Sequence, residues 1–257
     1  MKALHSLILG EGSKDLIVLH GFLGMGDNWK THAKKWATQG WRVHLIDQRN
    51  HGRSFWSDAF SYRDLANDLK DYYQSHGLQS ACVLGHSMGG KVAMLFACLY
   101  PEKVSELIVV DIAPKEYPAH HHVILAGLSA LDFSQITSRQ QADEFLAGYV
   151  KDLGTRQFLL KNIYRVTPLQ LGLRINIEVL ESSSAQIGEP LEQSAYYSGK
   201  TLFLKGANSG YIDYQDMALI HHHFPMVQLV SVENAGHWLH AENPTAFSHA
   251  IEQWWNA

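Results

Sequence analysis

The sequence has little charge, and it lacks both long runs of one sign and long apolar runs. Charged residues make up 18% of its 257 residues and hydrophobic residues 46%, which excludes an intrinsically disordered chain. The 21 basic and 25 acidic residues give a formal net charge of −4. Nucleic acid is therefore not an expected partner, because phosphate binding needs a clustered basic surface. No apolar run approaches the roughly 18 residues that span a bilayer, so no membrane span is expected.

Cysteine is also scarce, and the N-terminus lacks the features of a signal peptide. The apolar stretch at residues 1–11 is interrupted by His5 and Ser6 and then meets an acidic residue. Cys82 and Cys98 lie in separate apolar stretches without a Cys-x-x-Cys spacing. We therefore expect two reduced core cysteines and a cytoplasmic location.

Short apolar runs alternate with helix-length segments in the first half of the chain. Strands are predicted at four runs, and helices such as those at residues 62–76 and 88–100 separate them. This alternation is typical of βαβ units and a mostly parallel sheet. The four predicted strands cover residues 16–20, 41–47, 81–85 and 104–112.

The pattern changes at about residue 115, where strand signals stop and helical periodicity takes over. Strand-like runs return at residues 201–204 and 227–232, and a last helix is predicted at 245–255. Length alone allows one or two domains. We predict a single α/β domain, with a core formed by residues 1–114 and 199–257 and a helical cap formed by residues 115–198.

The most specific motif is Gly85-His86-Ser87-Met88-Gly89, a G-x-S-x-G sequence between a predicted strand and a predicted helix. In that context the serine occupies a sharp strand-to-helix turn that exposes its hydroxyl. Ser87 is therefore the candidate nucleophile. The N–H of Met88 lies at a helix N-terminus, where unpaired donors stabilise an oxyanion.

Two further segments supply candidate partners for this serine. The segment His20-Gly21-Phe22-Leu23-Gly24 follows the first strong strand, and the Phe22 N–H is the candidate second oxyanion donor. A serine hydroxyl needs a general base. His237 is the candidate because it follows the last predicted strand, at the sheet edge where α/β folds build their sites.

Four segments together resemble the YbfF-type bacterial esterases of the α/β-hydrolase superfamily. They are Val-Leu-His-Gly-Phe-Leu-Gly at 18–24, Asp-Gln-Arg-Asn-His-Gly-Arg-Ser at 47–54, Gly-His-Ser-Met-Gly-Gly-Lys at 85–91 and Val-Asp-Ile-Ala-Pro at 110–114. The resemblance implies the α/β-hydrolase fold, with a mostly parallel sheet of about eight strands, helices on both faces and a helical cap. It also implies hydrolysis of esters or thioesters without a cofactor.

The acid that would orient the histidine departs from the commonest pattern of this superfamily. Resemblance to the superfamily as a whole implies an acid in a Gly-x-x-Asp segment after the next-to-last strand, but Gly206-Ala207-Asn208-Ser209 offers a serine there. Asp111 and Asp213 are the alternatives, and both preserve the chain order Ser, Asp, His. Asp111 is preferred because a strand end is a rigid support, and the resemblance also indicates it.

Other polar clusters are expected to be structural. Asp47, Arg49 and His51 are interpreted as a buried group that braces the nucleophile turn. The clusters at 120–122 and 221–223 are consecutive histidines without the spacing of a zinc site, so no metal is predicted.

The predicted reaction is transfer of an acyl group to water through an acyl-enzyme. Phe22, Met88 and Trp238 are expected to line an apolar pocket for small to medium acyl groups, covered by residues 121–131. The expected partner is a small-molecule ester or thioester. The same residues would also serve a carbon–carbon bond hydrolase or a cofactor-free haloperoxidase, and a non-catalytic ligand receptor could use the same cavity.

Overall fold

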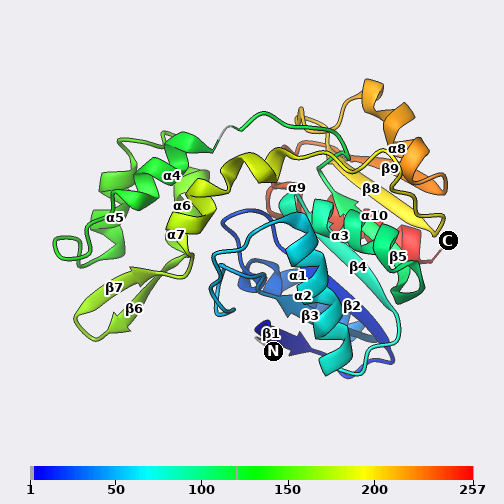
Figure 1. Ribbon diagram of the computed structural model, residues 1–257, viewed down its shortest axis with the longest axis horizontal. Helices are drawn as coiled ribbons and strands as arrows, with labels where there is room; N and C mark the ends of the chain where they lie inside the picture. The colour runs from blue at the N-terminus through cyan, green and yellow to red at the C-terminus, as the bar shows by residue number, and fades with distance from the viewer. Residues whose placement is uncertain (1–2, 120, 257) are drawn as a thin grey trace.

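A seven-stranded, mostly parallel sheet forms the centre of the protein in the computed structural model, which describes residues 3–119 and 121–256 (Figure 1). The strand order is β1-β3-β2-β4-β5-β8-β9, and only β1 is antiparallel to its neighbour. Because β4 lies in the middle, the turn that follows it is central on the sheet edge. The strands are β1 (Ser6–Leu9), β2 (Lys14–Leu19), β3 (Trp41–Ile46), β4 (Ala81–His86), β5 (Val104–Val110), β8 (Thr201–Gly206) and β9 (Val227–Val232).

Helices cover both faces of the sheet, because alternate residues of the strands are apolar on both sides. Ile17 and Leu19 face one core cluster, whereas Leu16 and Val18 face the other. The first cluster contains residues of α2 (Tyr62–Ser75), α3 (Met88–Leu99) and α8 (Met217–His223). The second contains residues of α1 (Lys30–Thr38) and α10 (Pro244–Trp255).

The predicted fold class is confirmed, with two differences in the sheet. Each predicted strand is present, and no predicted end differs from the observed one by more than two residues. The described residues form seven strands in this sheet instead of about eight, because the segment before β2 supplies the single edge strand β1. The strand β1 was not predicted, since the sequence around it was considered only as a possible signal peptide.

The described part of residues 115–198 holds four α-helices, one 3-10 helix and one hairpin, which extend beyond one end of the sheet (Figure 1). The hairpin was not predicted, because four of the five residues of β6 are at least partly exposed and show no apolar alternation. The elements are α4 (His122–Ser129), α5 (Arg139–Leu146), α6 (Leu153–Leu160), α7 (Ile177–Ser182) and the antiparallel pair β6 (Ile163–Thr167) and β7 (Gln170–Leu173).

Lys91 of α3 ties both ends of this segment to the core. Its ammonium donates hydrogen bonds to the carbonyls of Lys115 (2.7 Å), Gly188 (3.2 Å) and Glu189. Burial lowers the pKa of Lys91 to about 7. One buried cation therefore holds the two connections between residues 115–198 and the sheet.

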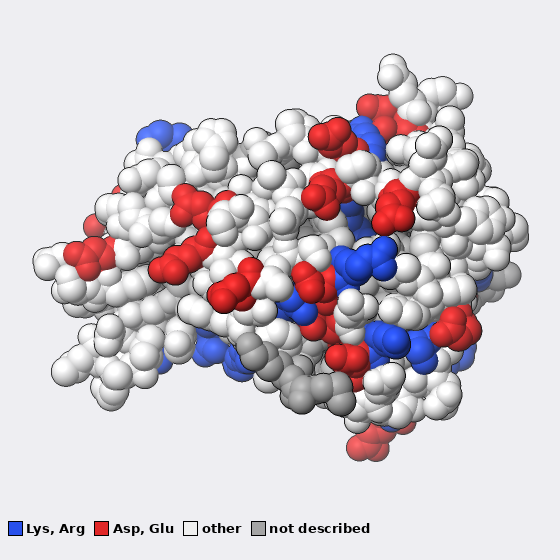
Figure 2. Space-filling model, in the orientation of Figure 1, with Lys and Arg blue, Asp and Glu red and all other residues white. Residues whose placement is uncertain are grey.

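The expectations about cysteines, membrane spans and charge can be compared with the structure. Cys82 is buried and Cys98 is half-buried, and both thiols are free. Within residues 3–119 and 121–256, no helix combines the length and apolarity needed to cross a membrane. Acidic and basic side chains are interspersed on the face shown in Figure 2, without a large area of one sign.

Candidate active site

Ser87 occupies a strained turn between β4 and α3. Its backbone has φ 52° and ψ −119°, a conformation that a residue with a side chain rarely adopts. The turn is tight enough to require both flanking glycines: a Cβ on Gly85 would lie 2.1 Å from the Gly89 carbonyl oxygen, and one on Gly89 would lie 2.4 Å from that of Leu19. The local structure therefore has the geometry that the G-x-S-x-G motif predicts.

The two predicted oxyanion donors flank this serine. Met88 is the first residue of α3, and Phe22 lies in the turn after β2. In the part of the chain that the structure describes, no hydrogen bond is recorded from either backbone N–H. Both groups are thus available to bind a negatively charged oxygen.

His237 and Asp111 form a hydrogen-bonded pair at the same edge of the sheet. The ring Nδ1 of His237, in the loop after β9, is 2.8 Å from Asp111 Oδ2. Asp111 is fully buried at the end of β5 and has a φ of 50°. When Nδ1 donates its proton to the carboxylate, Nε2 remains as the acceptor, which is the state a general base needs.

Ser209 completes the surroundings of this carboxylate. Its hydroxyl donates a hydrogen bond of 2.5 Å to Asp111 Oδ2, and the Gly206 N–H donates one of 3.0 Å to Oδ1. The segment at residues 206–209, which has no acid of its own, thus holds the carboxylate of Asp111 at the end of the neighbouring strand. The sequence analysis noted Ser209 only as a missing acid.

The alternative acid Asp213 has a different role in the structure. Its carboxylate accepts a hydrogen bond from the Gln215 N–H at the start of the helical turn η4 (Tyr214–Asp216). It also lies 3.7 Å from the Lys115 ammonium, and its side chain is 56% exposed. Asp213 therefore caps a short helix and does not contact His237.

Two residues that the sequence analysis did not single out fix the position of His237. The ring of Tyr211 stacks on the imidazole, with centroids 3.8 Å apart and planes 16° apart. His86 Nε2 donates to the His237 carbonyl oxygen at 2.9 Å. His86 was visible within the G-x-S-x-G motif, whereas no sequence pattern distinguishes Tyr211.

Ser87 and His237 line one cavity of about 260 Å³. No hydrogen bond between the Ser87 hydroxyl and the His237 ring is recorded among the described residues. Such contacts are often long before substrate binds. The apolar part of the lining comprises Phe22, Leu23, Trp29, Ile124, Phe158, Leu159 and Trp238.

Two of the three residues predicted to line the pocket border this cavity. Phe22 and Trp238 border the cavity, but Met88 does not; it borders a separate space of about 20 Å³ on another side of Ser87. The side chain of Met88 packs into the core because α3 begins there and Met88 is only 1% exposed. A larger cavity of about 690 Å³, between residues 56–59 and helices α4 and α7, contains none of the candidate catalytic residues.

The histidine clusters considered for metal binding make other contacts. His222 Nε2 and His223 Nδ1 lie 3.0 and 2.6 Å from the backbone carbonyl oxygens of Gln193 and Ala195. His121 packs edge-on against the ring of Phe22, and His120 lies outside the described residues. Among the described residues there is no group of three or more side chains placed to hold a metal ion.

Several other histidines are buried next to the candidate site. Burial lowers the pKa of His20 to about 4 and those of His51 and His240 to about 3. Burial lowers the pKa of His86 well below its usual value, and the nearby His237 adds to this effect. These rings are therefore neutral at pH 7, and their hydrogen bonds are those of uncharged imidazoles.

Comparisons with known proteins agree with this geometry. A family model described as the alpha/beta hydrolase fold matches residues 15–244. The sn-1-specific diacylglycerol lipase ABHD11 of Mus musculus is 36% identical over 96% of this chain and 83% of the relative. Esterase YbfF of Escherichia coli is 31% identical over 96% and 94% of the two chains. A solved structure described as a marine microorganism esterase has 39% identity and a TM-score of 0.95, over 99% of this chain and 100% of the other. The predicted resemblance is thereby confirmed.

Proposed function

Because the chain belongs to the α/β-hydrolase family, we propose that it is a carboxylic ester hydrolase that uses Ser87, His237 and Asp111 as a catalytic triad. The observation that carries this proposal is the pairing of His237 with the buried Asp111 at the cavity that holds Ser87. The names of the relatives, esterase and lipase, agree with an ester substrate.

Each of these residues has a separate role in the acylation step. His237 Nε2 takes the proton of the Ser87 hydroxyl as its oxygen attacks the acyl carbonyl. The negative charge that develops on the carbonyl oxygen is stabilised by the N–H groups of Phe22 and Met88. Asp111 holds the imidazole in the required tautomer and stabilises its positive charge after proton transfer. The imidazolium then protonates the leaving alcohol.

Deacylation repeats these roles with water. His237 takes a proton from the water molecule, whose oxygen attacks the carbonyl of the acyl-enzyme, and the proton then returns to Ser87. Thioesters present the same acyl carbonyl and are included in the proposal. The chemistry requires no group beyond the side chains and backbone donors already described.

Residues 115–198 act as a cap in this proposal. Ile124 of α4 and Thr155, Phe158 and Leu159 of α6 form one side of the cavity, opposite the sheet edge that carries Ser87. A volume of about 260 Å³ is near the lower end of the range for ligand pockets, about 300 Å³. The cavity therefore suits acyl groups of small to medium length.

The first prediction concerns acyl length. In a series of p-nitrophenyl esters, kcat/KM should rise by up to about fourfold per added methylene, because each buried methylene contributes about 0.8 kcal/mol. The rise should stop and reverse once the cavity is full. Steady-state rates from acetate to palmitate measure this directly, and a palmitate ester hydrolysed faster than butyrate would contradict the proposed acyl range.

The second prediction identifies the acid. Asp111→Asn should lower kcat about 10⁴-fold, because an amide at this position leaves the wrong histidine tautomer. Asp213→Asn is the matched control, since it changes an acid in the neighbouring segment that caps η4, and it should keep near-normal kcat. Kinetics on a p-nitrophenyl butyrate substrate compare the two. The assignment is wrong if Asp111→Asn retains full activity or if Asp213→Asn loses it.

A further inference from the structure

Leu23, next to the candidate oxyanion donor Phe22, has an unfavourable backbone conformation. Its φ is 59°, in the left-handed region that favours glycine, although Leu23 carries a branched side chain and is buried. Such a conformation persists only where surrounding contacts enforce it. The contacts that hold Leu23 therefore also set the direction of the Phe22 N–H.

Both backbone polar groups of Leu23 are held by buried side chains from elsewhere in the chain. Its N–H donates to His51 Nε2 at 3.2 Å, and its carbonyl oxygen accepts from Asn162 Nδ2 at 2.8 Å. His51 and Asn162 are both fully buried. Each lies far from Leu23 in sequence, so two separate segments hold one residue.

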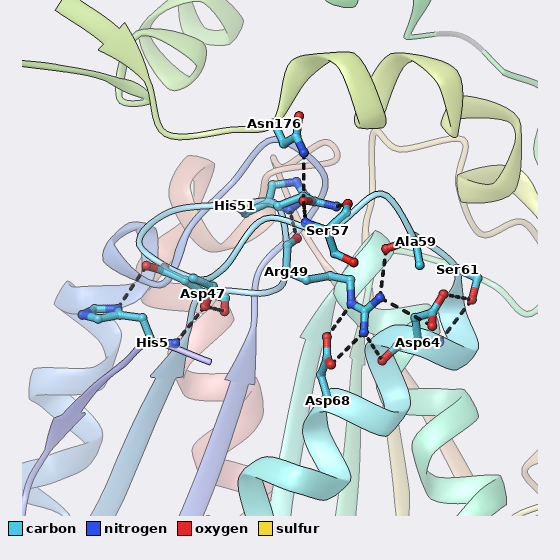
Figure 3. A network of polar contacts seen from close by, with 12 residues as sticks. His5, Asp47, Arg49, His51, Ser57, Ala59, Ser61, Asp64, Asp68 and Asn176 are labelled. Atoms are coloured by element: carbon cyan, nitrogen blue, oxygen red, sulfur yellow. Dashed lines mark hydrogen bonds and ion pairs between the residues drawn. The ribbon is translucent and has the colours of Figure 1, made fainter. Parts of the chain in front are cut away.

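His51 belongs to a rigid polar loop after β3. Its Nδ1 is 2.9 Å from the Arg49 carbonyl oxygen, so Nδ1 is the donor and Nε2 is free to accept from Leu23. Figure 3 shows Arg49 held by Asp68, with its guanidinium 2.5 and 2.8 Å from the two carboxylate oxygens. This loop, interpreted from sequence as a brace of the Ser87 turn, directly contacts the oxyanion segment.

Asn162 comes from the proposed cap, between α6 and β6. Its amide nitrogen also lies 3.3 Å from the Leu159 carbonyl oxygen, and its backbone carbonyl accepts from the Arg174 N–H at 2.8 Å. Its side-chain oxygen is buried and has no hydrogen-bond partner among the described residues. The hydrogen bonds of this side chain are therefore made by its amide nitrogen, which lies near the carbonyl oxygens of Leu23 and Leu159.

We propose that Asn162 is a positioning residue, which links the cap to the oxyanion hole by holding Leu23 in its left-handed conformation together with His51. The inference rests on the proposed esterase function. Without the Asn162 donor, the 22–23 segment relaxes and the Phe22 N–H no longer points at the oxyanion. Removal of the Asn162 donor should therefore weaken stabilisation of the transition state more than it weakens substrate binding.

Asn176 provides a matched control within the same segment. It is also a nearly buried asparagine, and its Nδ2 donates to Asn50 Oδ1 at 3.2 Å. Figure 3 shows it reaching from above towards the loop that contains His51. Its side chain joins the cap to the core without contacting Leu23, so Asn176→Leu reports the effect of losing one cap contact alone.

The test compares Asn162→Leu with Asn176→Leu in the full chain. Asn162→Leu should lower kcat for p-nitrophenyl butyrate about 10- to 100-fold with KM within about twofold. The affinity for an alkyl trifluoromethyl ketone, whose adduct carries an oxyanion, should fall in parallel. Asn176→Leu should keep kcat within about threefold. Asn162→Ala removes the same donor without adding bulk, and it should reproduce the kcat loss if the leucine variant does not fold.

The outcomes separate this inference from the proposed function. An unchanged kcat in either folded Asn162 variant overturns the positioning role, and so does an equal loss in Asn176→Leu, which would reflect general docking of the cap. A loss seen only as a raised KM overturns it as well. If the wild-type protein does not hydrolyse the ester, the proposed function itself fails.

Discussion

Replacement of Ser87 by alanine should lower kcat for p-nitrophenyl butyrate by about four to six orders of magnitude. Ser87 lies on the strained turn between β4 and α3 and lines the cavity, and removal of a triad nucleophile in serine hydrolases costs up to about 10⁶-fold. The oxyanion donors and the cavity remain, so the variant should still bind the ester and hydrolyse it about 10³- to 10⁴-fold faster than the uncatalysed reaction in water. Steady-state and single-turnover kinetics measure both quantities.

The control for this variant is Ser105→Ala. Ser105 is exposed near the start of β5, at the end of the strand away from Asp111, and its loss should leave kcat unchanged. Thermal unfolding of both variants establishes that each is folded. An Ser87→Ala protein that is folded and hydrolyses the ester at near wild-type rate would contradict the assignment of the nucleophile.

The second large effect is a loss of stability in mild acid. The pKa values of His20, His51 and His240 are about 4, 3 and 3 in the folded protein, because burial disfavours the charged ring, whereas the usual value is 6.5. Between these values the unfolded chain binds protons that the folded chain does not. The free energy of unfolding therefore falls as the pH drops below 6.5.

Each such histidine adds about 1.4 kcal/mol per pH unit to the slope of the unfolding free energy against pH. The three together give a slope that approaches about 4 kcal/mol per pH unit. Over two pH units this is comparable to the total stability of a domain, about 5–15 kcal/mol. We therefore expect the protein to unfold between about pH 5 and pH 4. Urea unfolding at a series of pH values measures the slope.

His240→Phe tests the origin of this acid sensitivity. A phenyl ring retains the stack on Trp29, whose ring centroid lies 4.2 Å from that of His240, but it cannot be protonated. The variant should take up about one proton fewer on unfolding, so the slope of the unfolding free energy against pH should decrease by about 1.4 kcal/mol per pH unit. His221→Phe, at an exposed histidine, should leave it unchanged. Stability that stays level from pH 6.5 to 4.5 would contradict the account of buried neutral histidines.

Much of the candidate site could be predicted because its signals are local. Ser87 is recognisable from the glycines around it and from the strand and helix on either side, since these create the strained turn. His237 follows one predicted strand and Asp111 lies at the end of another, and the carboxyl ends of parallel strands meet at one edge of a sheet. The fold class followed from the same alternation of strands and helices.

The remaining parts depend on contacts between distant segments. The sequence favoured Asp111 but left Asp213 open as the acid, because the path of the chain after β8 decides which carboxylate reaches His237. The stacking of Tyr211 on His237 has no sequence signal. Asn162 donates to a carbonyl 139 residues away, and nothing in its own surroundings indicates this partner. The hairpin was missed because its exposed strands lack a buried face.

The central claim is that Ser87 carries the acyl group, and covalent labelling tests it most directly. The wild-type protein should react with a fluorophosphonate at a stoichiometry of one, with the mass increase on the peptide that contains Ser87. Loss of ester hydrolysis should match the labelled fraction at each time point. Complete labelling of Ser87 with activity retained, or complete inactivation with the label on another residue, would contradict the account.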